Sequence, residues 1–253
     1  MKTRLAIALL LLAALPTRAE EVVLGLSQNS VSIDTTFSGS QILLFGAIKR
    51  EVAIPADELG VVVTIAGPSQ PLDVRRKERR FGIWVNVDAV EVDSAPSFYA
   101  VATSGPWAQV LSQVEDLRHK ISIPRAIRSV GAPSTVQNAQ DFTDAVIRIR
   151  TRSGAYQIRE GAVELSEQTL FRTSVDLPSN LTEGAYVTRI FLTRNSNVVS
   201  QYETIIDVRK VGMERWLFEL SREDAVVYGL MSLAIAIAAG WGASEAFRLL
   251  RRG

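Results

Sequence analysis

The sequence contains no cysteine and only one histidine, His119. Without cysteine the chain has no disulfide, no thiolate metal site, no cysteine nucleophile and no lipid-modified N-terminal cysteine. A single imidazole excludes most zinc sites and most histidine relays, so we expect no metal and no cofactor. Neither sign of charge is in excess, because 28 basic residues oppose 27 acidic ones for a net charge of +1. This balance lacks the basic face that nucleic-acid binding needs, so we expect no nucleic-acid partner.

The rest of the composition is that of a folded protein. Apolar residues make up 47% of the 253 residues and charged residues 22%, which argues against intrinsic disorder. A chain of this length can form one large domain or two small ones, each with its own core.

The first residues have the order of a secretory signal peptide. Two basic residues, Lys2 and Arg4, precede an apolar run from Leu5 to Leu15, and a small residue, Ala19, ends the segment. We therefore predict a signal peptide over residues 1–19, cleaved after Ala19. The alternative is an uncleaved anchor, for which the run is short, because a spanning helix needs about 20 residues.

An apolar stretch near the other end predicts a transmembrane helix over residues 224–246. Residues 225–243 carry no charged side chain, which is close to the length that crosses a bilayer. A buried core helix is the alternative. Aromatic side chains near the two ends are expected at the water–lipid boundary, where amphipathic rings are favoured; they are Trp216, Phe218, Tyr228 and Trp241.

The segments on either side of this helix set the expected topology. A basic tail over residues 247–253 contains Arg248, Arg251 and Arg252, which the positive-inside rule places in the cytoplasm. The signal peptide exports the body, so both ends predict a single-pass protein with its body outside the cytoplasm. Residues 213–223 read as a juxtamembrane amphipathic segment, with a linker docked on the β-rich part as the alternative.

The body changes from strands to helices and back. Residues 20–105 read as short strands separated by turn signals, with nearly continuous apolar runs at Gln41–Ile48 and Val61–Ala66. Residues 106–153 switch to helical periodicity, and strands return over residues 154–212. We predict a mainly β fold, with one or two immunoglobulin-like β-sandwich domains, a helical insertion and one C-terminal transmembrane helix. Whether the second β-rich stretch is a separate domain stays open.

Individual side chains in the body carry further expectations. In the helical stretch, Val110, Leu111, Val114, Leu117 and Ile121 recur at the spacing of one buried helix face. Glu115 and His119, four residues apart, read as a helix-surface pair more simply than as a catalytic relay. The aromatics in or beside the strands are expected mainly to fill cores, although they could line a groove; they are Phe81, Trp84, Phe98, Tyr99 and Trp107.

Two clusters are candidates for binding. Small residues spaced by four form one ridge along the predicted spanning helix, where a second helix could approach closely; they are Ser232, Ala236, Gly240 and Ser244. The densest charge cluster falls on a predicted hairpin tip, where it could contact an anion or lipid head groups; it comprises Arg75, Arg76, Lys77, Arg79 and Arg80. The plain alternatives are ordinary small residues of a spanning helix and a solvated hairpin tip.

Four stretches resemble an alphaproteobacterial putative transmembrane protein family; they are Phe37–Gly46, Phe81–Asn86, Pro96–Val101 and Tyr228–Leu230. The resemblance covers essentially the whole mature chain. It implies a bacterial inner-membrane location with the body in the periplasm and the C-terminus in the cytoplasm. It supplies no catalytic residues, and it implies a transporter or permease as a membrane partner.

No reactive constellation stands out in the sequence, so we do not expect an enzyme. We expect a membrane-anchored periplasmic binding or assembly protein, an accessory subunit that contacts membrane lipid and docks a membrane protein, either a second copy or a transporter. One alternative is a periplasmic ligand or envelope-stress sensor that acts through a partner. The other is a cell-wall-directed enzyme with paired carboxylates, for which the candidates are Glu91, Asp93, Glu160 and Glu164.

Overall fold

A computed structural model describes residues 21–27, 30–33, 37–50, 57–129, 138–210, 217 and 220–250. The predicted signal peptide lies outside the described residues, as do most of residues 213–223 and the side chains of Trp216, Phe218, Arg251 and Arg252. The chain forms two compact units. One comprises Met1–Val31 and Ser38–Val208, and the other comprises Ser32–Phe37 and Arg209–Gly253.

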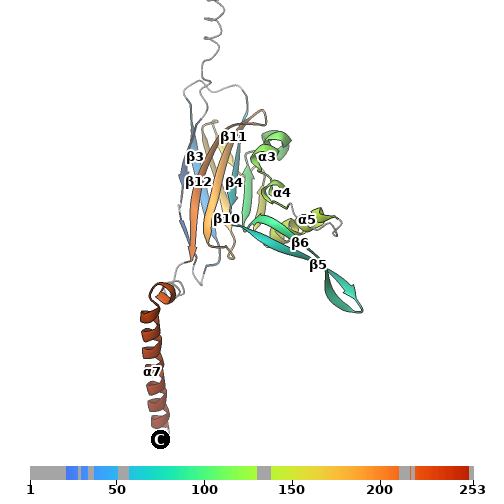
Figure 1. Ribbon diagram of the computed structural model, residues 1–253. Helices are drawn as coiled ribbons and strands as arrows, with labels where there is room; N and C mark the ends of the chain where they lie inside the picture. The colour runs from blue at the N-terminus through green and yellow to red at the C-terminus, as the bar shows by residue number, and fades with distance from the viewer. Residues whose placement is uncertain are drawn as a thin grey trace, which may run out of the picture. The chain divides into compact units, whose positions relative to one another are not determined.

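The body is built on two stacked sheets (Figure 1). The smaller, four-stranded sheet has the order β1-β3-β10-β9, with β1 at Glu21–Leu26, β3 at Ser40–Lys49, β10 at Leu170–Leu177 and β9 at Glu164–Ser166. The larger, six-stranded sheet has the order β2-β12-β11-β4-β7-β8. Its strands are β2 (Ser30–Ile33), β12 (Asn197–Lys210), β11 (Gly184–Arg194), β4 (Leu59–Ala66), β7 (Tyr99–Thr103) and β8 (Tyr156–Arg159).

Strands from both β-rich stretches of the sequence share both sheets. In the smaller sheet β3 pairs with β10, and in the larger sheet β4 pairs with β11, both antiparallel. Because each sheet needs strands from both stretches, the body is one sandwich rather than two. The mainly β prediction is confirmed.

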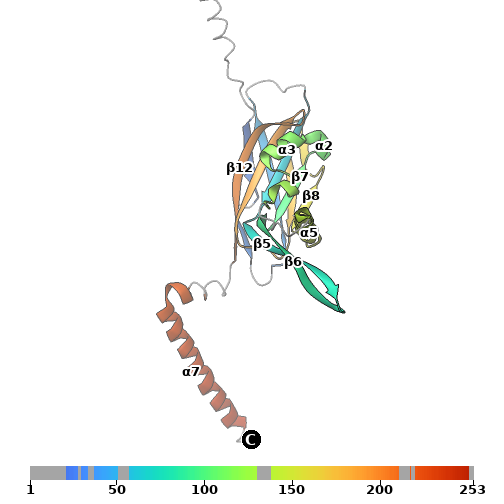
Figure 2. The same cartoon turned by 45° about the vertical axis from the view of Figure 1, so that its right-hand side comes forward.

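The helical insertion covers the outer face of the larger sheet (Figures 1 and 2). It consists of α2 (Trp107–Val110), α3 (Gln113–His119), α4 (Ile123–Ala126) and α5 (Ala139–Arg152). The central strand β4 is therefore buried on both faces. Alternate side chains point to opposite faces of a strand: Val62 belongs to the core under the helices, with Ile121 and Val146, while Val61 and Val63 point into the core between the sheets.

The predicted helix face is buried only in part. Val110, Leu111 and Ile121 are buried as predicted, but Val114 and Leu117 are exposed and Glu115 is buried instead. The predicted single helix breaks, because the Ser112 side chain caps a new start by accepting a hydrogen bond from the Glu115 N–H. Leu111, which follows α2, is extended, so α3 does not continue the helix of α2.

The second unit contains α7, at Ala225–Leu250. Within it, Ala225–Ser244 is long and apolar enough to cross a membrane, and none of that window is buried in the protein. The predicted transmembrane helix is therefore confirmed by length and composition, with a C-terminal end a few residues beyond the predicted one. Its first turn is fixed where the Tyr228 N–H donates to the Asp224 carbonyl.

Candidate functional site

The predicted basic cluster lies on a two-stranded ribbon formed by β5 (Ser69–Arg80) and β6 (Ile83–Pro96). At its base the ribbon is part of the core, because Val90 and Val92 are fully buried and Val92 packs with Ile121 and Val146 of the helical insertion. From residue 75 to residue 89 no side chain of the ribbon is buried, so its outer half projects away from the sandwich (Figure 2).

The register of the ribbon divides the basic cluster between two faces. Residues directly opposite each other in an antiparallel pair lie on the same face of the ribbon. The partners of Arg76 and Lys77 are Asp88 and Asn86, so β6 has one extra residue, a bulge, at this point. Because the bulge is on β6, successive side chains of β5 still alternate between the two faces. On one face both arginines have acidic partners: Arg76 pairs with Asp88, and Arg80 with Glu78 at 3.0 Å. We call this the paired face. The Arg76 guanidinium also lies 5.7 Å from the centre of the Phe142 ring of α5.

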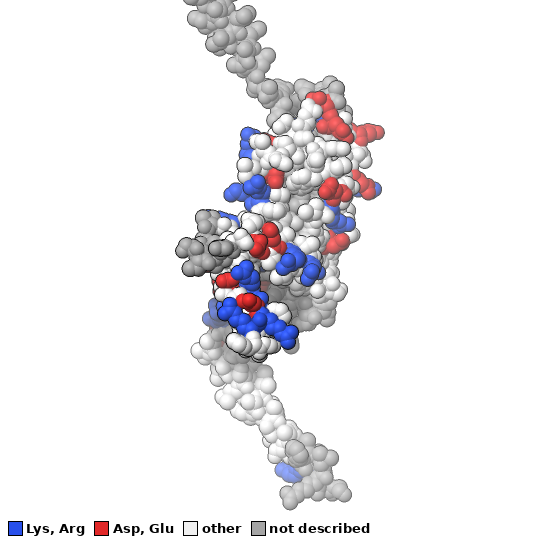
Figure 3. Space-filling view, turned by 90° about the vertical axis from the view of Figure 1, so that its right-hand side faces the viewer, with Lys and Arg blue, Asp and Glu red and all other residues white. Residues whose placement is uncertain are grey.

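The opposite face carries Arg75, Lys77 and Arg79, with Trp84 opposite Arg79. We call these four residues the cationic face. Among the described residues none of the three cations has an ion-pair partner, and Arg79 makes only a long hydrogen bond, 3.4 Å, to the Gly82 carbonyl. The cations of the cluster are therefore balanced on one side of the ribbon and unbalanced on the other. Figure 3, which faces the ribbon, shows Lys and Arg side chains gathered on it.

The tip of the ribbon is apolar. Phe81 is fully exposed, and Ile83 and Trp84 are about two-thirds exposed. The prediction that aromatics near strands fill cores is confirmed for Phe98 and Tyr99, which are buried, and is wrong for Phe81 and Trp84. The reason is that these strands continue well beyond the sandwich, so their ends have no core to fill.

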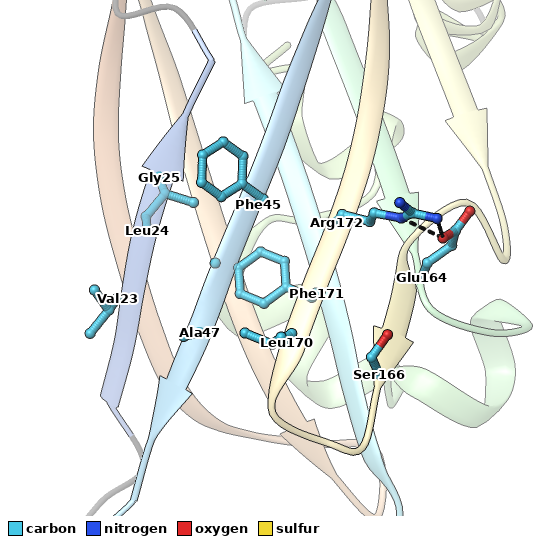
Figure 4. A pocket seen from close by; sticks show the side chains of 11 residues that line it. Val23, Leu24, Gly25, Phe45, Ala47, Glu164, Ser166, Leu170, Phe171 and Arg172 are labelled. Carbon is cyan, nitrogen blue, oxygen red and sulfur yellow. Dashed lines mark hydrogen bonds and ion pairs between the residues drawn. The ribbon is translucent and has the colours of Figure 1, made fainter.

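A second surface lies on the outer face of the smaller sheet (Figure 4). Val23, Ala47 and Leu170 are cross-strand partners in one row. In the next row the Phe45 ring lies over Gly25, where a Cβ would overlap it. Together with Leu43 these side chains form an apolar surface that we call the outer patch. The sequence predicts no such patch, because an apolar strand run is equally consistent with burial on both faces.

The outer patch lines an open surface pocket of about 580 Å³. Glu164 and Arg172 stand at its rim and form a short ion pair, in which the Arg172 Nε–H donates to Glu164 Oε2 at 2.6 Å. The lining is otherwise almost entirely apolar. Such a surface suits an apolar protein segment or acyl chain, and it offers no group positioned for acid–base chemistry.

The predicted ridge lies on the exposed surface of α7. Steps of four residues keep its members on one face, with a slow drift around the helix axis. All four members are exposed, and a Cβ at Gly240 would have no neighbour within 4 Å outside its own helix. Tyr228 and Trp241 are also exposed, and their place at the membrane interface stays a prediction. Arg248 is exposed beyond the apolar window.

Four of the candidate catalytic groups, Glu115, His119, Glu160 and Glu164, are used in ordinary structural contacts. Glu115 is buried rather than on the helix surface. It pairs with Arg118 at 2.7 Å and His119 at 3.4 Å, and it accepts from the Val198 N–H. Of the four candidate carboxylates, Glu160 accepts the Trp107 N–H, Glu164 pairs with Arg172, and Glu91 and Asp93 are exposed on β6. No group of three or more His, Asp or Glu residues in the described ranges is placed to hold a metal.

A polar network that sequence reasoning missed fixes the helices to the larger sheet. The Tyr99 hydroxyl donates to the Ile121 carbonyl at 2.8 Å, and the Arg189 guanidinium donates to the His119 carbonyl at 2.8 Å and the Lys120 carbonyl at 3.1 Å. Burial raises the pKa of the Tyr99 hydroxyl, and the nearby Arg189 opposes that shift. These contacts satisfy the carbonyls at the end of α3, so their role is structural.

Comparison with known proteins supports the membrane assignment. No curated protein matches the sequence. Residues 21–249, nearly the whole chain after the predicted signal peptide, match the model of a family described as putative transmembrane protein (Alph_Pro_TM). This match confirms the resemblance seen in the four sequence stretches. The chain belongs to the putative transmembrane protein family Alph_Pro_TM, and it is a membrane protein whose β-sandwich body is followed by a membrane-spanning helix.

Proposed function

We propose that this protein is an accessory subunit, anchored in the bacterial inner membrane by one helix, that docks a membrane partner such as a transporter. In this proposal the body lies in the periplasm and the short C-terminal tail lies in the cytoplasm. The observation that carries the proposal is the outer patch, an apolar surface on a face of the sandwich that a freely dissolved body would normally keep polar.

The energetics of the outer patch suit an interface. Its large members, Val23, Leu43, Phe45 and Leu170, are between 43% and 56% exposed, so each has about half of its surface left to bury. Complete burial of such a side chain is worth about 1.5–3 kcal/mol, so burying the remainder of four gives roughly 3–6 kcal/mol before the costs of association. A protein partner that covers the patch would therefore gain a useful share of a micromolar affinity, about 8 kcal/mol.

The ridge on α7 supports a partner within the membrane. Lipid tails are as apolar as leucine, so helices associate in a bilayer through close packing of small residues rather than through the hydrophobic effect. Gly240 has no side chain, so replacing it with leucine would add bulk to the ridge and keep a second helix from approaching closely. A partner could use the ridge and the outer patch independently, which allows each contact to be tested by itself.

The test is affinity purification of the full-length protein from native membranes in mild detergent. Leu170→Glu places a charge in the outer patch, and Ile205→Glu is the matched control, because Ile205 of β12 is also 56% exposed. We expect a stoichiometric membrane protein to co-purify with the native chain and with Ile205→Glu, and to be lost or strongly reduced with Leu170→Glu. Gly240→Leu tests the ridge in the same way. Monomeric protein from every preparation would refute the proposal.

A further inference from the structure

We propose that the tip of the β5–β6 ribbon is a second membrane attachment, which binds a bilayer that contains anionic phospholipid. Phe81, Ile83 and Trp84 enter the interfacial layer, and Arg75, Lys77 and Arg79 of the cationic face contact lipid phosphates. This inference does not depend on the proposed partner, since it concerns the protein and lipid alone.

The exposure and backbone conformation of Phe81 support the proposal first. Phe81 is fully exposed, and with Gly82 it forms the two-residue connection of the ribbon, with φ values of 50° and 87°. A two-residue hairpin loop with both φ values positive favours Asn, Asp or Gly, and a bulky residue there is strained. Phe81 therefore gains nothing from packing and is disfavoured by the backbone. A contact outside the chain explains why an aromatic side chain occupies this position.

The charge distribution is the second observation. On the paired face, two arginines oppose Glu78 and Asp88, so the face is neutral. On the cationic face, Arg75, Lys77 and Arg79 follow one another toward the tip, where Arg79 is the register partner of Trp84. The acidic pair Asp73 and Glu91 lies on this face only nearer the base. An aromatic ring flanked by Lys and Arg is the composition that favours the boundary between water and an anionic lipid surface. The ribbon has this composition only on one face and at its tip, so that face would lie toward the membrane surface.

The position at which the ribbon leaves the sandwich also supports the proposal. The base of the ribbon begins after Pro68, which lies against Gly184, and Gly184 is the register partner of Val208 near the end of β12. The ribbon thus leaves the sandwich from the end at which the chain continues toward α7. β12 ends at Lys210 and residues 220–223 before α7 are helical, so residues 211–219 join the two. Nine residues span at most about 30 Å, and the 12 residues of β5 span about 40 Å. The connection therefore permits the tip to reach the bilayer that holds α7.

The test uses the full-length protein in nanodiscs that hold one copy each, with either zwitterionic lipid alone or a mixture that includes anionic phosphatidylglycerol. The chain has no cysteine, so Ile83→Cys introduces a single site for a spin label at the tip. Ala89→Cys, exposed on the cationic side nearer the base, reports the control position. We expect the tip label to become accessible to oxygen and protected from a water-soluble relaxing agent in anionic discs, while the control label stays in water.

Two pairs of variants test the assigned residues. Arg75→Gln/Arg79→Gln and Arg76→Gln/Arg80→Gln remove the same charge from opposite faces of the ribbon. Each cation near an anionic surface contributes roughly five-fold to binding. Removing Arg75 and Arg79 should therefore lower the ratio of inserted to free tip about 30-fold, whereas removing Arg76 and Arg80 should change it little. Phe81→Asn should also release the tip while leaving the melting temperature unchanged or higher, since Asn suits the turn.

Three results would overturn the proposal. The tip label could stay in water in anionic discs, or both charge pairs could reduce insertion equally, which would remove the role of the cationic face. The tip could also be protected only in discs that hold two copies, which would make it a contact between copies of the chain. Because no other protein is present, these results leave the partner proposal unaffected.

Discussion

Replacing Gly46 by alanine probes a close approach of backbone and ring in the core between the two sheets. Gly46 lies on the inner face of β3, and a Cβ there would overlap the Phe171 ring and lie 2.9 Å from the Val23 carbonyl oxygen. The ring belongs to a fully buried side chain, and the carbonyl belongs to a neighbouring strand, so neither can move away cheaply. Overpacking of this kind costs about 1–3 kcal/mol, and two obstacles place the expectation near the upper end.

The assay is chemical unfolding of the full-length protein in detergent micelles, followed by near-ultraviolet circular dichroism. Gly105→Ala is the matched control, because its Cβ would meet only a Val110 methyl group at an ordinary 3.5 Å. The control should be neutral, or stabilising by about 0.4–1 kcal/mol through reduced freedom of the unfolded chain. Equal free energies of unfolding for the two variants would refute the packing described for Gly46. Phe171→Leu should relieve part of the cost in the double variant.

The remaining predictions concern buried polar groups. Burial raises the pKa values of the Tyr99, Tyr156 and Tyr186 hydroxyls above their ordinary value of about 10, so the folded state holds these protons more tightly. Their contribution to the stability of the folded state is complete below about pH 10 and is lost as the pH rises through the raised pKa values. Tyr99→Phe should therefore reduce the loss of the free energy of unfolding with increasing pH above about pH 10. An unchanged slope of this free energy against pH would contradict the prediction. Glu115→Ala should cost about 2–3 kcal/mol in the same unfolding assay, because it leaves the Val198 N–H without its acceptor, whereas Leu117→Ala on the exposed face should stay within about 0.5 kcal/mol.

The two apolar strand runs show how far sequence reasoning reaches in this fold. Gln41–Ile48 and Val61–Ala66 look alike in the sequence, and both form strands, as predicted. Their environments differ, because α2 to α5 cover the larger sheet, whereas Leu43 and Phe45 on the smaller sheet remain exposed. Nothing local to either run encodes which sheet receives a second cover. The outer patch is therefore visible only once the layers are known.

Strand pairing explains why the number of domains could not be predicted. β3 and β10 pair with the register Leu44↔Thr173, a separation of 129 residues that no periodicity records. The same limit applies to α3, which starts anew at the Ser112 cap and buries Glu115 rather than Val114 and Leu117. By contrast, the spanning helix depends only on local composition, and its start was predicted to within one residue, although α7 runs four residues beyond the predicted end at 246.

The basic cluster could be predicted from the sequence in part. Its division into two faces, which the sequence does not show, bears on how the body lies at a membrane. The sequence places five cations within six residues, but only the register shows that two are neutralised and three are not. A body held by one helix is already concentrated at the bilayer, where an intramolecular contact acts at an effective concentration on the order of millimolar. A lipid contact of only millimolar affinity would then hold the ribbon tip in the interface about half of the time. Under the proposed attachment, three cations and an aromatic tip are enough, and the second contact would restrict the rotation of the body that a single helix permits.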